Sequence, residues 1–334
     1  MATTPERQAT EAAIERALSY LVSQQQPSGA IAQGQHDTTM TSLAIMALAS
    51  TGVTPMQADA KGEAMRKALD FVLQQDRRTP EGYFGQADGS RMYGHGITTL
   101  MLSEMAGMGF DHEQDDKIHE ACQAGIDLIL KAQRRSKDGA NRGGWRYTPD
   151  STDADLSVSV WQLMALRSAK NDGLEVPSGS IEQAIGYLKR SCTSPLSADG
   201  KPTQTESGFH YTPGGADIQF SMTAAGVLAM QVCGQYDSPL VTQATEWLKK
   251  NPPQWGARYV LYGTYYYAQG MHQQGGTTAL DAERIVRELL LPRQQEDGSW
   301  NPEGEEGAGG KIYATCMAVL SLSVNYHYLP IYQR

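Results

Sequence analysis

The spacing of apolar residues along the chain alternates between two helical patterns. The first places apolar side chains at i, i+4 and i+7, as at Ile14, Leu18 and Leu21, and predicts a helix with one buried stripe. The second is rich in Ala, Thr and Met, has few charges, and predicts a helix buried on nearly all sides. The first pattern occurs at 13–21, 65–73, 121–130, 181–188, 241–248 and 280–291, and the second at 38–49, 97–105, 156–169, 221–232, 260–271 and 313–324.

Glycine and proline residues separate these helix pairs, so the chain repeats one unit with a period of about 50 residues. The tail after the last pair is aromatic and apolar, whereas an open solenoid normally ends in a polar cap. This difference favours a closed all-α toroid, an (α/α)6 barrel in a single domain, with an open solenoid as the alternative. The expected units are approximately 11–52, 62–109, 117–173, 179–236, 240–276 and 280–324, followed by the tail at 325–334.

The turns after the outer helices share a further pattern, Gln-x-x-x-Gly-x-Trp, formed by Gln294, Gly298 and Trp300. A glutamine can bond backbone groups at a helix end, the glycine allows a positive-φ turn, and the aromatic ring packs on the next unit. We therefore expect a structural role for these turns. Looser copies end at Ile31, Phe84, Trp145 and Phe209, and the fifth unit has no clear copy.

Composition excludes several classes of function. The net charge of -9, without a stripe of Lys or Arg, argues against nucleic-acid binding. The four cysteines lie far apart and are expected to be buried thiols. No nucleotide-binding or serine-hydrolase motif occurs, so no cofactor is expected.

No apolar run approaches the ~20 residues of a transmembrane segment, and the N-terminus lacks the pattern of a signal peptide. We expect a soluble protein, cytoplasmic as the sequence stands or exported if a leader has been trimmed.

The stretch 143–166 joins a glycine turn, an acidic pair and the start of an inner helix. Asp153 and Asp155 stand directly before that helix. Two close carboxylates can share a proton, so one of them can stay protonated in a dry pocket and act as an acid. The alternative is a helix cap, because Asp accepts hydrogen bonds from the free amides of a first turn. Asp37 and Asp217 precede other inner helices, which strengthens this alternative.

The chain resembles bacterial prenyltransferase/squalene-oxidase repeat proteins in MYGHGITTL (92–100), GGWRY (143–147), DADLSV (153–158), RQQEDGSW (293–300) and YLPIYQR (328–334). Its turns and helix pairs are also similar to those of squalene and oxidosqualene cyclases and of protein prenyltransferase β subunits. The resemblance covers nearly the whole chain. It implies an α/α toroid that binds an isoprenoid or another apolar small molecule in its central cavity.

The resemblance to class II terpene cyclases implies that Asp155 is a proton donor and Asp153 its partner. Those enzymes carry Asp-x-Asp-Asp-Thr before an inner helix, whereas here Leu156 replaces the third Asp. Prenyl transfer is not expected. The zinc-binding Cys and His and the diphosphate-binding cations of prenyltransferases are missing at the matching segments 217–219, 313–315 and 208–215.

Other residues have two interpretations each. Tyr262 and Tyr266 share a helix face and either stabilise a cation through their π faces or form a packing stripe. His36, His95 and His210 precede inner helices and would gather at one mouth of a toroid, too far apart to share a metal ion. The segment 303–310, rich in Gly and Glu, is expected to be a mobile loop with solvated carboxylates.

The main functional prediction is an isoprenoid-binding toroid with acid chemistry at Asp155. One alternative is a non-catalytic binding or scaffold protein, with a possible protein partner at the mouth. The second alternative is a carbohydrate-active α/α barrel with paired carboxylates. The predicted catalytic residues are Asp155 and Asp153, no metal is expected, and the predicted cavity residues are His95, Tyr93, Trp145, Trp161, His210, Tyr211, Asp217, Tyr262 and Tyr266.

Overall fold

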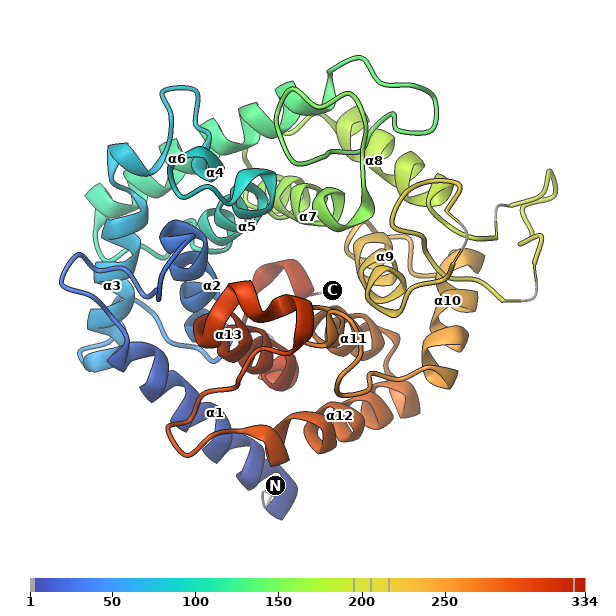
Figure 1. Cartoon of the computed structure of the whole chain (residues 1–334). Coiled ribbons are helices and arrows are strands. Elements are labelled where there is room, and N and C mark those ends of the chain that lie inside the picture. Colours follow the sequence, from blue (N-terminus) through green and yellow to red (C-terminus); the bar gives the residue numbers. More distant parts are fainter. Residues whose placement is uncertain (1–3, 195, 205, 216, 327, 334) are drawn as a thin grey trace.

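Two concentric rings of helices surround a common axis in the computed structural model, which describes residues 4–194, 196–204, 206–215, 217–326 and 328–333 (Figure 1). The predicted all-α toroid of helix pairs is confirmed, and the open solenoid is wrong. In the described residues the inner ring consists of α2 (Asp37–Ala49), α5 (Arg91–Glu104), α7 (Leu156–Asn171), α9 (Phe220–Val232), α11 (Val260–Gln274) and α13 (Gly310–Leu322), and the outer ring of α1 (Pro5–Ser23), α3 (Ala60–Val72), α6 (His112–Gln133), α8 (Ser178–Arg190), α10 (Pro239–Lys250) and α12 (Gly276–Leu290).

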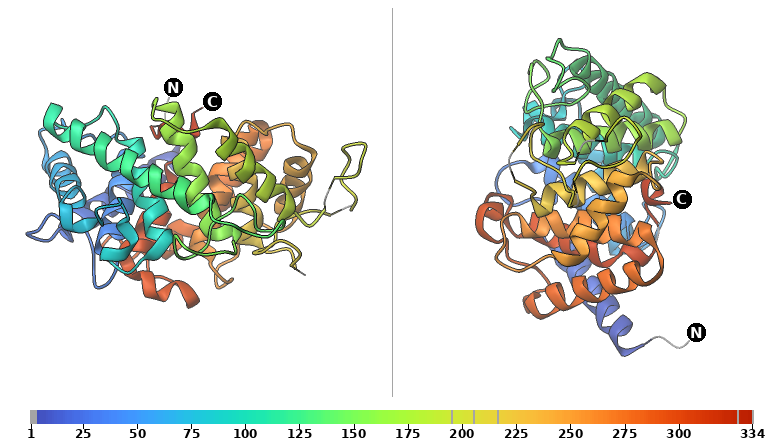
Figure 2. Two further views of the ribbon diagram at one scale, coloured as in Figure 1. Left: turned by 90° about the horizontal axis from the view of Figure 1, so that it is seen from above. Right: turned by 90° about the vertical axis from the view of Figure 1, so that its right-hand side faces the viewer.

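Short helices lie in the connections and in the tail. The connection between α8 and α9 extends away from the ring (Figure 2). No helix within the described ranges is long and apolar enough to cross a bilayer. The short helices are α4 (Phe84–Ala87), η1 (Gln75–Arg77), η2 (Leu291–Arg293), η3 (Gly304–Gly309), η4 (Val324–Tyr326) and η5 (Pro330–Tyr332).

Helix positions follow the predicted patterns, but several helices begin earlier than predicted. In α2 every side chain of 38–49 is buried, as expected for an inner helix with few charges. The outer helix α6 was predicted from the start of its apolar stripe at 121. It begins at His112 instead, because the Asp111 side chain accepts a hydrogen bond from the Gln114 amide. This cap stabilises a polar first turn that contributes nothing to the stripe.

The glutamine of the turn motif joins neighbouring units and closes the ring. The side-chain amide of Gln294 donates to the Gly298 carbonyl of its own turn at 2.9 Å and to the Ala13 carbonyl of α1 at 2.7 Å. Gln25 and Gln133 make the same two kinds of bond, to their own turn and to the next outer helix, at 2.8–3.1 Å. The last unit thus contacts the first as consecutive units contact each other.

The glycine and the aromatic residue of this turn complete the junction. Gly298 has a φ of 89°, and a Cβ at this position would lie 2.4 Å from the Arg16 carbonyl oxygen of α1. The Trp300 backbone amide donates to the Thr315 hydroxyl at 3.1 Å, and its indole donates to the Leu290 carbonyl at 2.8 Å. The motif therefore ties an outer helix, an inner helix and the next unit together.

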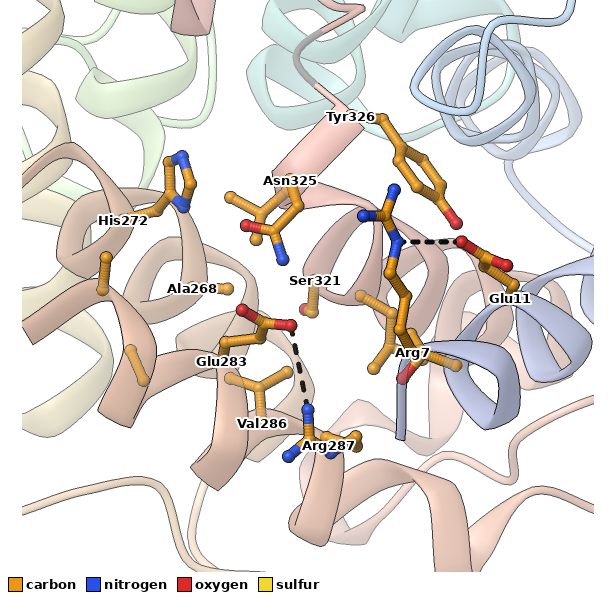
Figure 3. Close-up of a pocket in the computed structure, with 15 residues that line it drawn as sticks. Arg7, Glu11, Ala268, His272, Glu283, Val286, Arg287, Ser321, Asn325 and Tyr326 are labelled. Carbon is orange, nitrogen blue, oxygen red and sulfur yellow. Dashed lines mark hydrogen bonds and ion pairs between the residues drawn. The ribbon is translucent and has the colours of Figure 1, made fainter. Parts of the chain in front are cut away.

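A small pocket of about 200 Å³ lies at this seam, between α1 and α12. Its charged side chains are paired with one another, Arg7 with Glu11 at 3.0 Å and Arg287 with Glu283 at 3.7 Å (Figure 3). The helix α1 packs on α13 and α3 more than on α12. The pocket therefore marks incomplete packing at the seam, and the turn after α12 supplies the closure.

The C-terminal tail closes one end of the barrel. The Gln273 side chain donates to the Tyr332 carbonyl at 2.5 Å, and the Tyr265 and Tyr332 hydroxyls bond to each other. The Ile331 amide donates to both carboxylate oxygens of Glu104 at 3.2 Å. An apolar tail thus fills the barrel instead of capping a solenoid. Two residues of the predicted tail, 327 and 334, lie outside the described residues.

Glu104 is buried beneath this tail. Desolvation raises its pKa to about 8, although hydrogen bonds from the Ser168 hydroxyl and the Ile331 amide act in the opposite direction. A carboxyl group with this pKa holds its proton in the folded protein where an exposed carboxyl group has lost it.

Substitution of Gly298 by Ala should weaken the closure of the ring. The new Cβ meets the Arg16 carbonyl, whereas a Cβ at Gly34, which has a φ of 83°, meets no atom within 4 Å. Both variants place a Cβ on a backbone with positive φ, which costs about 1–2 kcal/mol in the folded protein. We expect Gly298→Ala to lower the free energy of unfolding by about 2 kcal/mol more than Gly34→Ala in urea titrations. Equal losses would contradict the role of this contact.

Stability should fall with rising pH because of Glu104. Its pKa rises from 4.5 to about 8 on folding, so between these values the unfolded chain releases a proton that the folded protein keeps. Below about pH 6.5 the buried His95, whose pKa is lowered from 6.5 to about 4, contributes a slope of opposite sign. From about pH 6.5 to 8 the free energy of unfolding should therefore decrease by about 1 kcal/mol per pH unit because of Glu104. Glu104→Gln should remove this slope in urea titrations across the window. Glu113→Gln, at an exposed side chain, should keep it. An unchanged slope in Glu104→Gln would rule out the buried proton.

Candidate functional site

A cavity of about 650 Å³ opens at the end of the barrel where the inner helices begin, opposite the tail. Trp161, Ile97 and Leu43 line it from deeper along their helices. Nearer the mouth the walls are aromatic and polar. The residues there include Tyr93, Tyr147, Tyr211, Tyr259, Tyr262, Tyr313, His36, Glu305 and Glu306. A concave site with aromatic walls and a few convergent polar groups is typical of small-molecule binding.

Two lining residues have an unusual backbone. His36 and Tyr259 precede α2 and α11 with φ values of 63° and 54°. Residues other than glycine rarely adopt this left-handed conformation, and such residues concentrate at functional sites. The conformation of His36 is supported by a hydrogen bond from Nδ1 to the Asp88 carbonyl at 2.8 Å.

A chain of hydrogen bonds connects Asp155 with the cavity. Asp155 has no exposed surface, and its Oδ1 accepts from the Ser157 hydroxyl at 2.6 Å and from the Val158 amide at 2.9 Å. The Ser157 hydroxyl also bonds the Tyr93 hydroxyl at 2.5 Å. Ser157 and Tyr93 line the cavity. Asp155 thus caps α7 and is connected to the cavity through these two hydroxyls.

Arg146 faces both residues of the acidic pair. Its guanidinium lies 3.4 Å from Oδ2 of Asp155 and 3.6 Å from Oδ2 of Asp153, whose side chain is largely exposed. The expectation that these carboxylates share a proton is wrong, because a cation pairs with both. Burial raises the pKa of Asp155, and hydrogen bonds from Ser157 and Val158 and the charge of Arg146 oppose this shift.

Among the predicted cavity residues, Tyr93, Trp161, Tyr211 and Tyr262 line the cavity. The Tyr262 hydroxyl donates to the Ser157 carbonyl at 3.1 Å, so its side chain links α11 with α7. The hydroxyls of Tyr211 and Tyr147 bond to each other. These four side chains lie on different inner helices or on the loops before them, and ring closure brings them together.

The other predicted residues lie in the framework around the cavity. His95 is fully buried. Its Nδ1 accepts from the Phe84 amide at 3.4 Å and its Nε2 donates to the Gly125 carbonyl at 3.1 Å. Desolvation lowers the pKa of His95 to about 4, so the ring is neutral. The His95 ring accepts a hydrogen bond from the backbone amide of Phe84 in the preceding turn. The Thr315 hydroxyl accepts the equivalent hydrogen bond from the Trp300 amide in the last unit.

Trp145, His210, Asp217 and Tyr266 also lie outside the lining of the cavity. The Trp145 indole donates to the Ile129 carbonyl at 2.8 Å, which places it in the turn motif. The His210 ring bonds the Asp217 carbonyl at 2.9 Å, so these two residues order their own loop. Tyr266 is buried against Tyr262 and Trp161, as the packing stripe predicts. 

Glu306 is a cavity residue that sequence reasoning missed. Its carboxylate accepts from the Leu261 and Tyr262 amides at 3.0 and 2.8 Å and from the Tyr313 hydroxyl at 3.0 Å. Desolvation raises its pKa, and these three donors oppose the shift. The prediction of solvated carboxylates in segment 303–310 is therefore wrong for Glu306. Its glycine-rich surroundings gave no signal that the start of α11 would lie against it.

The cavity is able to bind a small molecule between aromatic faces and hydrogen-bonding groups. In the described part of the chain, no group of three His, Cys, Asp or Glu side chains is placed to hold a metal ion. The chemistry available to the site is therefore that of its carboxyl groups, hydroxyls and one imidazole.

Comparisons with known proteins find the fold among carbohydrate-active enzymes. An inactive variant of an α-1,6-mannanase of Salegentibacter sp. HEL1_6, in complex with α-1,6-mannotriose, superposes with a TM-score of 0.60 at 10% identity over 96% of this chain and 99% of that chain. A glycosidase variant in complex with glucose superposes with a TM-score of 0.63 at 13% identity over 99% and 100%. A possible GH105 family member from Salmonella enterica serovar Paratyphi A has a TM-score of 0.55 at 11% identity over 98% and 96%.

No protein-family model matches the sequence, and no curated protein matches it. The predicted membership in the prenyltransferase/squalene-oxidase repeat proteins, and with it the terpene cyclase function and the isoprenoid ligand, is wrong. The structural neighbours named above are glycosidases and a possible GH105 member, and two of them are complexes with carbohydrate. The turn motifs that suggested the resemblance hold helix pairs together and do not specify a ligand.

The two members of the acidic pair should differ in their effect on stability. Asp155→Ala removes the cap of α7 and leaves the Arg146 guanidinium without its buried partner. We expect a loss of about 2–3 kcal/mol in the free energy of unfolding. Asp153→Ala removes one exposed ion pair, for which we expect less than about 0.5 kcal/mol. Urea unfolding of both variants provides the measurement, and similar losses would contradict the assigned capping role.

Proposed function

We propose that the chain is a carbohydrate-active α/α barrel that binds a saccharide in the cavity and cleaves a glycosidic bond there. The observation that carries this proposal is the lining of the cavity, where aromatic faces alternate with hydrogen-bonding groups at the mouth of the barrel. The related fold of glycosidases that bind mannotriose and glucose supports the same class of substrate.

Aromatic side chains provide the binding surface. Trp161 lies deep in the cavity, and Tyr147 and Tyr211 lie at its rim, joined through their hydroxyls. The C–H face of a pyranose ring packs against such π faces, while tyrosine hydroxyls bond its polar edge. The Arg146 guanidinium lies 4.7 Å from the Tyr147 ring centroid and 5.6 Å from that of Tyr211, which holds both rings in place.

Two carboxyl groups at the end of the barrel where the cavity opens supply the chemistry. Asp155 precedes α7 and Glu306 precedes α13, and these helices face each other across the ring (Figure 1). Glycosidases commonly combine a carboxylic acid with an ionised carboxylate. Burial raises the pKa of Asp155, which favours the acid role. Burial raises the pKa of Glu306 as well, and the three donors that bind its carboxylate oppose this shift, so we assign Glu306 the ionised role.

The proton of Asp155 reaches the substrate through the hydroxyl chain. When Asp155 is protonated, the Ser157 and Tyr93 hydroxyls turn their hydrogens toward the cavity, which reverses the direction in which Ser157 donates to the ionised carboxylate. The glycosidic oxygen then takes the Tyr93 hydroxyl proton, Tyr93 takes the Ser157 proton, and Ser157 takes the Asp155 proton. The bond from the anomeric carbon to the protonated oxygen then breaks. Glu306 stabilises the positive charge at that carbon, and water adds to the carbon. The proton that this water loses returns through Tyr93 and Ser157 to Asp155, which restores the acid.

Neutral trisaccharides of mannose and glucose provide the test. Isothermal titration should show binding to the wild-type protein, and Tyr147→Ala should weaken it about 10-fold or more because a stacking face is lost. Tyr328→Ala, which removes an exposed ring from the tail at the other end, should leave the affinity unchanged. Absence of binding for the whole panel would overturn the proposal.

Cleavage is tested separately by chromatography of the products. Asp155→Asn keeps a side chain that caps α7 but removes the transferable proton, so the rate should fall about 100-fold or more. Binding of the trisaccharide should stay within about threefold of wild type. A variant that retains the wild-type rate would remove Asp155 from the mechanism. 

A further inference from the structure

Tyrosine hydroxyls at the mouth of the cavity donate their hydrogens to the protein. The Tyr262 hydroxyl donates to the Ser157 carbonyl at 3.1 Å, and the Tyr313 hydroxyl donates to the Glu306 carboxylate at 3.0 Å. A tyrosine hydroxyl has a single hydrogen. Once it is donated, only oxygen lone pairs remain for a ligand. Both side chains therefore present acceptors to the cavity.

A second set of lining residues is oriented in the same way by Asp88. His36 donates from Nδ1 to the Asp88 carbonyl at 2.8 Å, which orients its ring in the cavity wall. The Thr39 hydroxyl donates to Oδ2 of Asp88 at 2.8 Å. The Ser90 hydroxyl donates to Oδ1 at 2.5 Å. Asp88 thus binds the hydroxyl hydrogens of Thr39 and Ser90 and leaves the lone pairs of both hydroxyls for a ligand.

The formal charges of the lining residues favour a cation. Glu305 and Glu306 are both lining residues. Arg258 is the one Lys or Arg among the described lining residues, and its guanidinium is paired with Glu305 at 2.8 Å. Potential donors to a ligand remain at Tyr93, the proton donor of the proposed cleavage, at Gln219 and Ser221, where α9 begins, and at one of the two hydrogen-bonded rim tyrosines. Most of the wall therefore accepts hydrogen bonds, and its net charge is negative.

We infer that the saccharide bound here is an amino sugar whose free ammonium group enters the cavity. An ammonium group offers three donors and a positive charge, which matches acceptors, carboxylates and tyrosine faces together. A hydroxyl offers one donor and no charge. An N-acetyl group replaces the charge by an amide and adds a carbonyl acceptor, which a wall made mostly of acceptors matches less well than an ammonium group. The inference rests on the proposed function and adds the chemical class of the substrate.

Three trisaccharides with one β-1,4-linked glucose backbone test this inference by isothermal titration. They carry a free amine, an N-acetylated amine or a hydroxyl at the same carbon. The free amine should bind about 10-fold or more tightly than the other two. Spermidine, an ammonium donor without a sugar ring, should bind more weakly than the amino trisaccharide.

Matched tyrosine variants locate the effect. Tyr313→Phe keeps the ring but removes the oxygen that accepts from the ligand, so the affinity for the amino trisaccharide should fall about fivefold or more. The affinity for the neutral trisaccharide should stay within about twofold. Tyr187→Phe removes a buried hydroxyl outside the cavity lining and should change neither value.

The outcomes separate this inference from the proposed function. Equal affinities for the amine and the hydroxyl compound, or a preference for the N-acetyl compound, would overturn the inference and leave saccharide binding in place. Spermidine binding as tight as that of the amino trisaccharide would show recognition of the ammonium group alone and would overturn the assignment to a sugar. Binding of none of these compounds would overturn both proposals.

Discussion

Closure of the ring at the turn after α12 is the constraint on which the rest of the structure depends. Gln294 bonds the carbonyl of Ala13, and Gly298 lies where any Cβ would meet the carbonyl of Arg16, so the last outer helix is followed directly by the first. An open stack of helix pairs would leave the inner helices in a curved row. Closure places their first turns around one axis, and the cavity exists only because they meet there.

The two ends of the barrel follow from this closure. At one end the tail fills the space between the inner helices, with Tyr332 bonded to α11 and the Ile331 amide bonded to the buried carboxyl of Glu104. At the other end the residues that the structure describes place no comparable apolar segment in the opening. Tyrosines, His36 and the carboxyl groups of segment 303–310 surround an open cavity instead. The apolar tail stabilises the fold, and the polar mouth carries the proposed chemistry.

Asp155 illustrates how a cap can also contribute to a site. Its hydrogen bond to Val158 stabilises the start of α7, and its hydrogen bond from Ser157 connects it to Tyr93 in the cavity wall. Cap and acid were alternatives as long as only the sequence was considered, because both use an Asp before a helix. The structure combines the cap with a path for a proton, and the catalytic role stays a proposal.

The sequence by itself determined the helix pairs, their inner or outer position and the structural role of the turns, because these follow from local periodicity and from glycine conformation. Only the tertiary structure decided which side chains share the cavity. Glu306 binds the start of α11, which lies more than 40 residues before it in the chain. Arg146 forms ion pairs with both Asp153 and Asp155, the two carboxylates that local spacing had suggested as a proton-sharing pair. The Glu306 contact joins two units, and the Arg146 contact depends on how its own turn folds back on the start of α7, so the period of apolar residues encodes neither. The ligand class was likewise misjudged from motifs that hold the fold together.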